Sequence, residues 1–190
     1  MTEEKGKPNI DISVVNVVAS ASLDQKIDLL AIMKVFRNVE YRPKQFPGLV
    51  FRLKRPKTAT LIFSSGKMVC TGSTSEKEAI SAVNKVVREL KDNGIIILGK
   101  PKITIQNMVA SGNLHGSIDL ETAADILDNV MYEPEQFPGL IYRMHDPKTV
   151  LLLFASGKIV CTGAKSEEMV HESVGKIYEI LDDYDLLYND

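Results

Sequence analysis

The sequence predicts an α+β fold built from two tandem, pseudo-symmetric repeats, and three observations predict it. Gln-Phe-Pro-Gly-Leu occurs at 45–49 and again at 136–140, and Ser-Gly-Lys-x-Val-Cys-Thr-Gly occurs at 65–72 and again at 156–163, each time 91 positions later. Apolar, β-branched stretches bounded by Pro and Gly recur in both copies, as expected of short strands. Between them lie segments with apolar residues at helical spacing.

The repeat extends over almost the whole chain without a gap. Asn16 corresponds to Asn107, and Ile-Asp-Leu at 27–29 corresponds to the same residues at 118–120. Internal repeats decide the domain organisation before any single motif does. We therefore expect a short N-terminal tail (1–9), a first repeat (10–99) and a second repeat (101–190), joined by too short a linker to move independently.

Composition excludes several classes of protein. The 190 residues are 44% hydrophobic, enough for a sizeable core. No stretch of about 18 uncharged apolar residues predicts a membrane span, and the charged N-terminus lacks the apolar region of a secretory signal. Cys70 and Cys161 are repeat counterparts. They are better explained by duplication than by pairing, which favours a reduced, intracellular protein.

The net charge of −2 conceals an asymmetry. Residues 10–99 contain 14 Lys and Arg against 8 Asp and Glu, whereas residues 101–190 contain 6 against 15. One interpretation is drift of solvated surfaces after duplication. The other is that each half of the chain faces a different partner.

The first half of each repeat predicts a strand, a helix and a short extended piece. In the first repeat, Ile10–Val18 is mostly β-branched and predicts a strand. Ser22-Leu23-Asp24 resembles a helix N-terminus, and apolar spacing then predicts a helix over Asp24–Arg37. Asn38–Arg42 is extended and ends at a proline-bounded loop.

The second half predicts a three-stranded meander followed by a longer helix. The strands are Leu49–Arg55, Thr58–Ser65 and Lys67–Ser73. Ser75 and Glu78 form a capping box for the helix, which ends at Asn93-Gly94. Each repeat is thus strand, helix, four strands, helix, and two repeats give about ten strands and four helices.

Both faces of these strands are largely apolar. Side chains alternate along a strand, so one face carries Asn16, Val18, Leu61, Phe63, Val69 and Thr71. Four helices of this length cover only one side of ten strands. The other face is then an exposed apolar surface, and such surfaces mark binding sites.

That face combines aliphatic and Phe side chains with few polar groups and no carboxylate. The minor groove of A·T-rich DNA presents only acceptors, and apolar wedges can open base steps there. A quasi-twofold surface also suits a quasi-twofold duplex. The alternative is a duplicated scaffold whose sheet face docks a protein.

Catalysis and metal binding are not indicated. His115, His145 and His171 have no repeat counterparts and do not cluster with the cysteines. The sequence contains no complete phosphate-binding loop and no nucleophile motif. We expect no cofactor, no metal and no enzymatic activity.

The duplicated pattern FPGL(V/I)(F/Y)R…PKT…SGK(M/I)VCTG resembles the TATA-box-binding protein family of general transcription initiation factors, and the resemblance covers the chain after Pro8. It implies one curved, antiparallel sheet of about ten strands, shaped as a saddle with four helices on its convex side. Members of this family bind the minor groove, and a kink of about 80° is established for them. The bare N-terminus and acidic C-terminus are more similar to the archaeal branch, which implies a cytoplasmic, nucleoid-associated protein; a eukaryotic member would be nuclear.

The resemblance also implies roles for individual residues. The expected intercalating residues are Phe46, Phe63, Phe137 and Phe154. The expected base and groove contacts are Asn16, Val18, Leu61, Val69, Thr71, Asn107, Val109, Leu152, Val160 and Thr162. The expected phosphate contacts are Arg52, Ser65, Lys67, Arg143, Ser156 and Lys158.

The partners implied are double-stranded TATA-element DNA, transcription factor B and, indirectly, RNA polymerase. Glu133 and Glu135 match family positions that contact transcription factor B, whereas the first repeat has Arg42 and Lys44 there. This difference links the charge asymmetry to orientation of the complex. Whether the free protein associates weakly with a second copy through its apolar face is left open.

Overall fold

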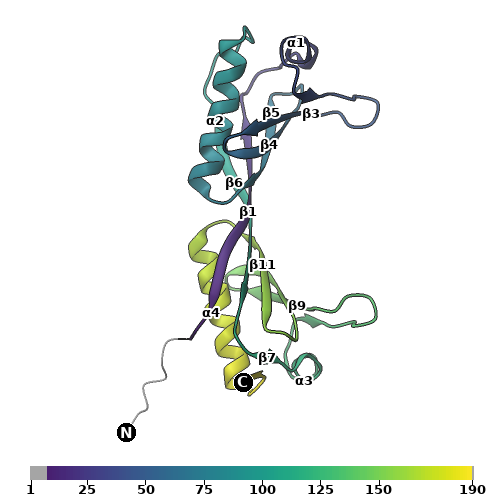
Figure 1. Cartoon of the computed structure of the whole chain (residues 1–190), viewed down its shortest axis with the longest axis vertical. Coiled ribbons are helices and arrows are strands. Elements are labelled where there is room, and N and C mark those ends of the chain that lie inside the picture. Colours follow the sequence, from purple (N-terminus) through teal and green to yellow (C-terminus); the bar gives the residue numbers. More distant parts are fainter. Residues whose placement is uncertain (1–7, 190) are drawn as a thin grey trace. The chain divides into compact units, whose positions relative to one another are not determined.

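The structure is a computed structural model that describes residues 8–189. Figure 1 labels most of its helices and strands. The elements of the first repeat are β1 (Asp11–Ser22), α1 (Leu29–Val35), β2 (Val39–Glu40), β3 (Leu49–Lys54), β4 (Lys57–Ile62), β5 (Lys67–Ser73) and α2 (Glu76–Asp92). Those of the second are β6 (Lys102–Asn113), β7 (Ser117–Ile118), α3 (Leu120–Ile126), β8 (Val130–Met131), β9 (Leu140–His145), β10 (Lys148–Leu153), β11 (Lys158–Ala164), α4 (Glu167–Asp183) and β12 (Leu187–Tyr188).

The described residues form a ten-stranded antiparallel sheet and four helices, which confirms the predicted α+β class and the order of elements in each repeat. The strand order is β2-β3-β4-β5-β1-β6-β11-β10-β9-β8. An additional pair, β7 with β12, was not predicted. It forms because Leu187 and Tyr188 follow α4 and pair with Ile118 and Ser117.

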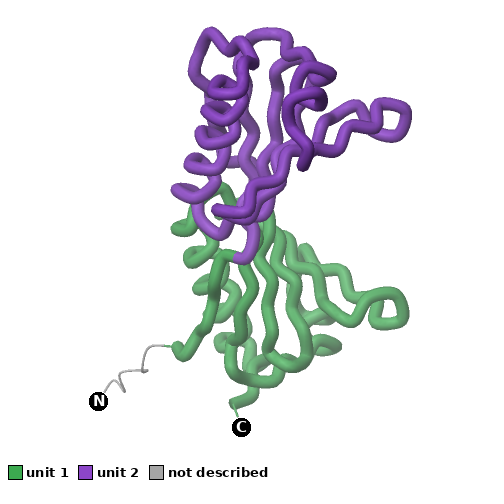
Figure 2. The backbone as a smooth tube through the Cα atoms, turned by 45° about the horizontal axis from the view of Figure 1, so that its top comes forward, with its two compact units in different colours: residues 1–14, 109–190 green, residues 15–108 purple. Residues whose placement is uncertain are grey.

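The chain divides into two compact units, coloured separately in Figure 2. Unit 2 comprises Val15–Met108, and unit 1 comprises the described residues before and after it. The boundaries are offset from the repeats because each long first strand contributes to both units. Residues 1–7 of the expected N-terminal tail lie outside the described residues.

The first helix begins later than predicted. The helix expected over Asp24–Arg37 is only Leu29–Val35 long, and Asp28 caps it by accepting the N–H groups of Leu30 and Ala31 at 3.1 and 3.2 Å. Asp24 has φ +53°, outside the helical region.

The backbone before this helix forms hydrogen bonds with the β4–β5 turn instead. Leu23 N–H donates to the Gly66 carbonyl at 3.1 Å, and Ile27 N–H donates to the Ser64 carbonyl at 2.9 Å. Both side chains are buried. Burial of Leu23 and Ile27 against the β4–β5 turn therefore overrides the local helix signal at Ser22-Leu23-Asp24.

The two long helices begin where predicted, and each buries one face. Ser75 accepts the Glu78 N–H at 3.0 Å, and its counterpart Ser166 accepts the Met169 N–H at 3.2 Å. In unit 2, α2 packs on β3, β4 and β5 (Figure 1). Its buried face consists of Ala79, Ala82, Val83, Val86, Val87 and Leu90. Burial of each larger side chain among them stabilises the fold by about 1.5–3 kcal/mol.

In each unit the helices cover one face of the strands and leave the other face partly exposed. Val17, Ile62, Met68 and Cys70, which alternate with the predicted site residues, are at most 1% exposed. In unit 1, Leu151, Ile159 and Cys161 are equally buried. The core of each unit thus lies between its helix and one sheet face, and the other face carries the partly exposed residues described next.

Candidate nucleic-acid interface

In unit 2, three neighbouring strands place the predicted base-contacting residues on one face. Leu61 of β4 lies directly opposite Val69 of β5. Asn16 and Val18 come from β1, which pairs with β5, and Thr71 follows on β5. All five side chains are partly exposed, whereas most of their neighbours along the strands, among them Val17, Ile62 and Cys70, are buried; Val15 and Gly72 are exposed. The strand alternation used in the sequence analysis is therefore correct here.

Unit 1 repeats this arrangement with its own residues. Leu152 of β10 lies opposite Val160 of β11, and Val150 lies opposite Thr162. These residues and Val109 are partly exposed. Asn107, on β6 just before the unit boundary, is partly exposed as well.

The Asn16 side chain is oriented by two hydrogen bonds. Thr71 Oγ1 donates to Asn16 Oδ1 at 3.2 Å, and the Gly72 N–H donates to the same oxygen at 2.8 Å. Because Oδ1 already accepts two hydrogen bonds, the Asn16 amide nitrogen Nδ2 is the group that can donate hydrogen bonds to a ligand. An amide NH₂ carries two donors, so this position presents donors on a largely apolar surface.

Each unit carries a pair of Phe rings held edge to face. Phe46 and Phe63 have ring centroids 5.9 Å apart at an interplanar angle of 69°. Phe137 and Phe154 are 5.8 Å apart at 73°. Phe46 and Phe137 remain 42% and 37% exposed, which is unusual for residues of this size.

The glycine of each Phe-Pro-Gly motif allows these rings to pair. A methyl group at Gly48 would lie 2.7 Å from Cε1 of Phe46 and 3.1 Å from Cε1 of Phe63. At Gly139 the corresponding distances, to Phe137 and Phe154, are 2.8 and 3.0 Å. Both rings therefore occupy the space that a larger residue would need.

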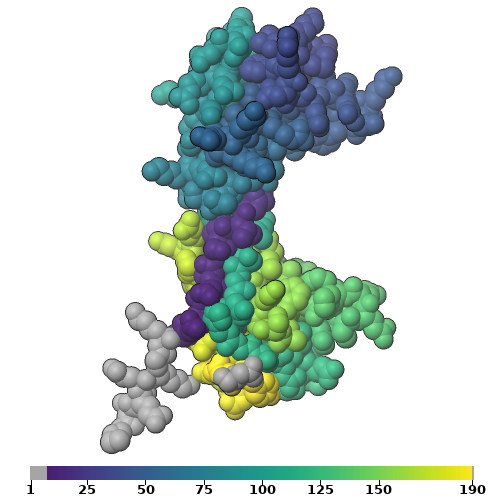
Figure 3. Space-filling model, viewed as in Figure 1, coloured from purple at the N-terminus to yellow at the C-terminus, as the bar shows by residue number. Residues whose placement is uncertain are grey.

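The loops that carry Phe46 and Phe137 project from their units (Figures 1 and 3). Each contains one tight turn, in which the Phe46 N–H donates to the Arg42 carbonyl and the Phe137 N–H donates to the Glu133 carbonyl, both at 3.0 Å. Glu133 and Glu135 are exposed, as are their counterparts Arg42 and Lys44. The two loops thus share a backbone turn and differ in charge.

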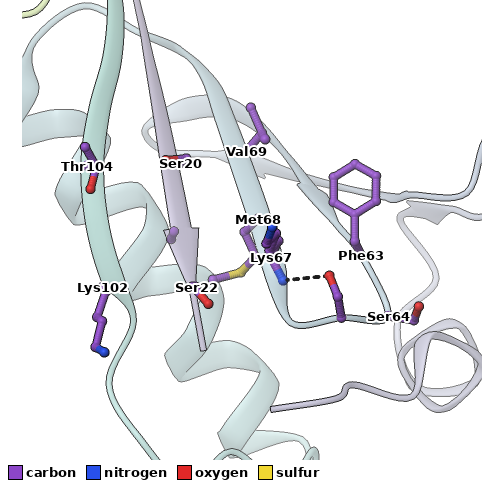
Figure 4. A pocket seen from close by; sticks show the side chains of 11 residues that line it. Ser20, Ser22, Phe63, Ser64, Lys67, Met68, Val69, Lys102 and Thr104 are labelled. Carbon is purple, nitrogen blue, oxygen red and sulfur yellow. Dashed lines mark hydrogen bonds between the residues drawn. The ribbon is translucent and has the colours of Figure 1, made fainter. Parts of the chain in front are cut away.

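The six predicted phosphate contacts are all exposed: Arg52, Ser65, Lys67, Arg143, Ser156 and Lys158. In the β4–β5 turn, the Lys67 N–H donates to Ser65 Oγ at 3.4 Å, as drawn in Figure 4. Gly66 makes this turn with φ +89°, and a methyl group there would meet the Gln25 carbonyl oxygen at 2.0 Å. Arg52 also pairs with Glu40 at 3.3 Å, whereas the position equivalent to Glu40 in the second repeat is Met131.

An open hollow lies beside the partly exposed Phe of each β-hairpin, Phe63 in unit 2 and Phe154 in unit 1. In unit 2 its volume is about 750 Å³, and Phe63, Ser65 and Lys67 line it together with Lys102 and Thr104 of β6 (Figure 4). In unit 1 a hollow of about 430 Å³ is lined by residues that include Phe154, Ser156 and Lys158. One predicted intercalating residue and two predicted phosphate contacts of each unit therefore line the same hollow.

Sequence reasoning missed several residues of this face. Ala59 lies opposite both Arg52 and Thr71, and Val50 lies opposite Leu61; both are partly exposed. Lys102 and Thr104 enter the unit 2 hollow from β6. The alternation of side chains would have found Ala59 and Val50, but the neighbouring strand that contributes Lys102 requires the sheet order.

The cysteines lie on the opposite, helix-covered face and are free thiols. Burial raises the pKa of the Cys70 thiol and raises that of Cys161 to about 11. Among residues 8–189, no group of three or more His, Cys, Asp or Glu side chains is placed to hold a metal ion. Of the helices described, none has the length and apolarity needed to cross a membrane.

Comparison with known proteins assigns the chain to a family. Residues 11–93 and 102–184 each match the family described as "Transcription factor TFIID (or TATA-binding protein, TBP)". The TATA-box-binding proteins of Pyrodictium occultum and Sulfurisphaera tokodaii are 58% and 56% identical to it, over 94% and 92% of this chain and 89% and 88% of theirs. The solved structure of the Methanococcus jannaschii TBP matches with a TM-score of 0.83 at 48% identity, covering 91% of this chain and 99% of that one. The chain therefore belongs to the TATA-binding protein family.

Proposed function

We propose that this general transcription factor binds the minor groove of TATA-box promoter DNA with the partly exposed sheet face of each unit and bends the duplex by inserting Phe side chains. As a member of its family it is a DNA-binding protein and not an enzyme. The observation that carries the proposal is the exposed Phe pair beside each Phe-Pro-Gly glycine, next to a largely apolar face with few hydrogen-bonding groups.

The chemistry of the face suits A·T base pairs. In the minor groove these pairs present only acceptors, whereas G·C pairs add a donor. Asn16 presents its amide donors because Oδ1 is already occupied by Thr71 and Gly72. Aliphatic groups such as Val18, Leu61 and Val69 fill the floor without competing for hydrogen bonds. A guanine amino group would meet this apolar surface without an acceptor.

The Phe pairs serve as wedges. Opening a base step costs a few kcal/mol, which is offset when the bent duplex contacts more protein surface. Phe63 and Phe154 are only partly exposed and are each braced by a second ring, so little side-chain freedom is lost on insertion. Phosphate contacts from Lys67, Lys158 and the other exposed basic and hydroxyl groups then fix the register.

We further propose that Glu133 and Glu135 recruit transcription factor B, and RNA polymerase through it. The position of the two residues supports this role. Both are exposed on a loop that projects from unit 1, and the same loop of unit 2 carries Arg42 and Lys44. A cytoplasmic, nucleoid-associated location accords with archaeal relatives such as that of Pyrodictium occultum. Weak self-association through the sheet face is the competing use of the same surface.

The test is DNA bending by Phe63→Ala and Phe154→Ala, measured by energy transfer between dyes at the two ends of a TATA duplex. Both variants should fold, since each loses only one partly exposed ring, and both should bend DNA much less. Ile96→Ala is the control, because Ile96 is 77% exposed and is not one of the predicted DNA contacts. Normal bending by the Phe variants would exclude the wedge role. A chain that binds no TATA duplex at all would favour a protein-docking scaffold.

A further inference from the structure

Each unit has an acidic and a basic side chain in contact near its Phe-bearing hairpin, and the two residue types occur in opposite order in the two units. In unit 2, Lys102 Nζ lies 3.0 Å from Asp24 Oδ2. In unit 1, His115 Nε2 lies 2.6 Å from Asp11 Oδ2. The repeat offset of 91 relates Asp11 to Lys102 and Asp24 to His115. Acid and base have therefore exchanged positions.

The exchange concerns the side chains and not the backbone. Asp24 and His115 both adopt the left-handed conformation, with φ +53° and +54°. Each N–H donates to the residue two positions earlier: Asp24 to Ser22 Oγ at 3.3 Å and His115 to Asn113 Oδ1 at 2.8 Å. The same backbone arrangement thus holds a lysine at the first residue of β6 in unit 2 and an aspartate at the first residue of β1 in unit 1.

Lys102 belongs to the hollow that the Phe63 hairpin forms. It lines that hollow together with Ser65 and Lys67, and its side chain is 80% exposed (Figure 4). An ammonium group has three N–H donors, so Lys102 can keep its contact with Asp24 and still donate to a phosphate. Lys158 is the lysine that lines the unit 1 hollow. Asp11, at the position equivalent to Lys102, does not line that hollow, but its backbone lies against Gly112, which does.

We propose that Lys102 is a further phosphate contact and that Asp11 disfavours phosphate at the equivalent position. This difference directs unit 2 to the half of the DNA element that has the more negative minor groove. The inference rests on the proposed DNA binding and adds a determinant of orientation. Narrow, A-tract minor grooves have an enhanced negative potential. Exposed charges act over about 8 Å at physiological salt, so the contrast acts locally on each half of the element.

The first experiment separates a phosphate contact from a structural ion pair. Lys102→Ala should weaken binding to a TATA duplex several-fold and reduce the slope of log affinity against log salt concentration by about 0.9, the loss of one phosphate contact. Asp24→Ala frees Lys102 and should leave that slope unchanged or steeper. Equal losses in both variants would show that only the ion pair matters and would overturn the proposal.

The second experiment measures orientation directly. An iron chelate is attached to a Lys44→Cys variant, whose native cysteines are buried, and cleavage is mapped on a palindromic A·T element. One half of the element carries neutral methylphosphonates. Cleavage should place unit 2 on the charged half in the otherwise unaltered chain, and Lys102→Ala combined with Asp11→Asn should reduce that preference severalfold.

The control changes the same charges away from the hollow. Lys77 and its repeat counterpart Glu168 are exposed on the first turns of α2 and α4. Lys77→Ala combined with Glu168→Gln should leave orientation unchanged. If the Lys77 and Glu168 double variant changed orientation as much as the Lys102 and Asp11 double variant does, the charge of each unit as a whole would explain the effect. That result would overturn the proposal. Bound protein without any preference would overturn it too, whereas absence of binding would instead refute the proposed function.

Discussion

The ring of Phe137 stands edge-on to that of Phe154, with centroids 5.8 Å apart, and joins a projecting loop to the β10–β11 hairpin of unit 1. Edge-to-face pairs contribute about 0.5–1.5 kcal/mol beyond their buried area. The contact therefore fixes the loop that carries Glu133 and Glu135 relative to the hairpin that carries Lys158. Gly139 is the residue that leaves room for it.

Gly139→Ala should reduce DNA bending while the protein remains folded. The new methyl group would lie 2.8 Å from one ring and 3.0 Å from the other, so at least one ring must move. Overpacking of this kind costs about 1–3 kcal/mol. Bending is measured with end-labelled TATA duplexes, and stability by thermal unfolding. Gly175→Ala is the control, since outside its own helix backbone and chain neighbours nothing lies within 4 Å of a methyl group there. Unchanged bending in Gly139→Ala would contradict the role given to the ring pair.

Asn16→Asp and Asn16→Ala should separate the structural and DNA-binding roles of this residue. Aspartate keeps an acceptor for the Thr71 hydroxyl and the Gly72 N–H, but it removes the amide donors and adds a negative charge. We expect Asn16→Asp to retain the free energy of unfolding better than Asn16→Ala, which removes two hydrogen bonds that each contribute about 0.5–1.5 kcal/mol.

DNA binding should rank these two variants in the other order. Asn16→Asp places a carboxylate against the acceptors of the groove, so its affinity for a TATA duplex should fall below that of Asn16→Ala. Urea unfolding and fluorescence titration supply the two measurements. If both variants bind DNA as the unaltered chain does, Asn16 has no role in base contact.

The sequence predicted the sheet because its evidence was periodic. A 91-residue repeat and strict alternation, as in Leu61-Ile62-Phe63, identified both the strands and the face of each residue. As predicted, Ile62 lies on the opposite face from Leu61 and Phe63: it is buried, whereas they are partly exposed. Features set by tertiary contacts were missed. The start of α1 depends on Leu23 and Ile27 bonding to the β4–β5 turn, and β12 depends on a partner strand far away in the sequence.

The candidate site shows the same division. Motif positions and alternation identified the face residues, but they gave no reason for the glycines at 48 and 139. That reason is steric and appears only when two rings from different segments converge. Lys102 was missed because its place beside Phe63 depends on the order of strands in the sheet, which local patterns do not specify.

The buried thiols should resist modification in the folded protein. Burial raises the pKa of Cys161 from 9.0 to about 11, so at pH 9 its thiolate fraction is about fiftyfold lower than in the unfolded chain. Because the folded state holds its proton more tightly, the free energy of unfolding should fall as pH rises from 9.0 towards about 11. Ellman's reagent should label neither cysteine until guanidinium unfolds the chain. Rapid labelling under native conditions would mean that the helix-covered face opens.

Reversing the charge of the second projecting loop should impair recruitment of transcription factor B without weakening DNA binding. Glu133→Arg combined with Glu135→Lys gives this loop the residues that the first loop has at 42 and 44, and the turn that both share is made by backbone groups. The substituted loop should therefore keep its shape, and its added positive charge should, if anything, strengthen association with DNA.

The reciprocal variant, Arg42→Glu combined with Lys44→Glu, is the control and should leave recruitment through the second loop intact. A mobility shift of the TATA complex by transcription factor B reads out recruitment. An undiminished shift with the Glu133 and Glu135 variant would move the partner site elsewhere, because no other property of the loop has been changed.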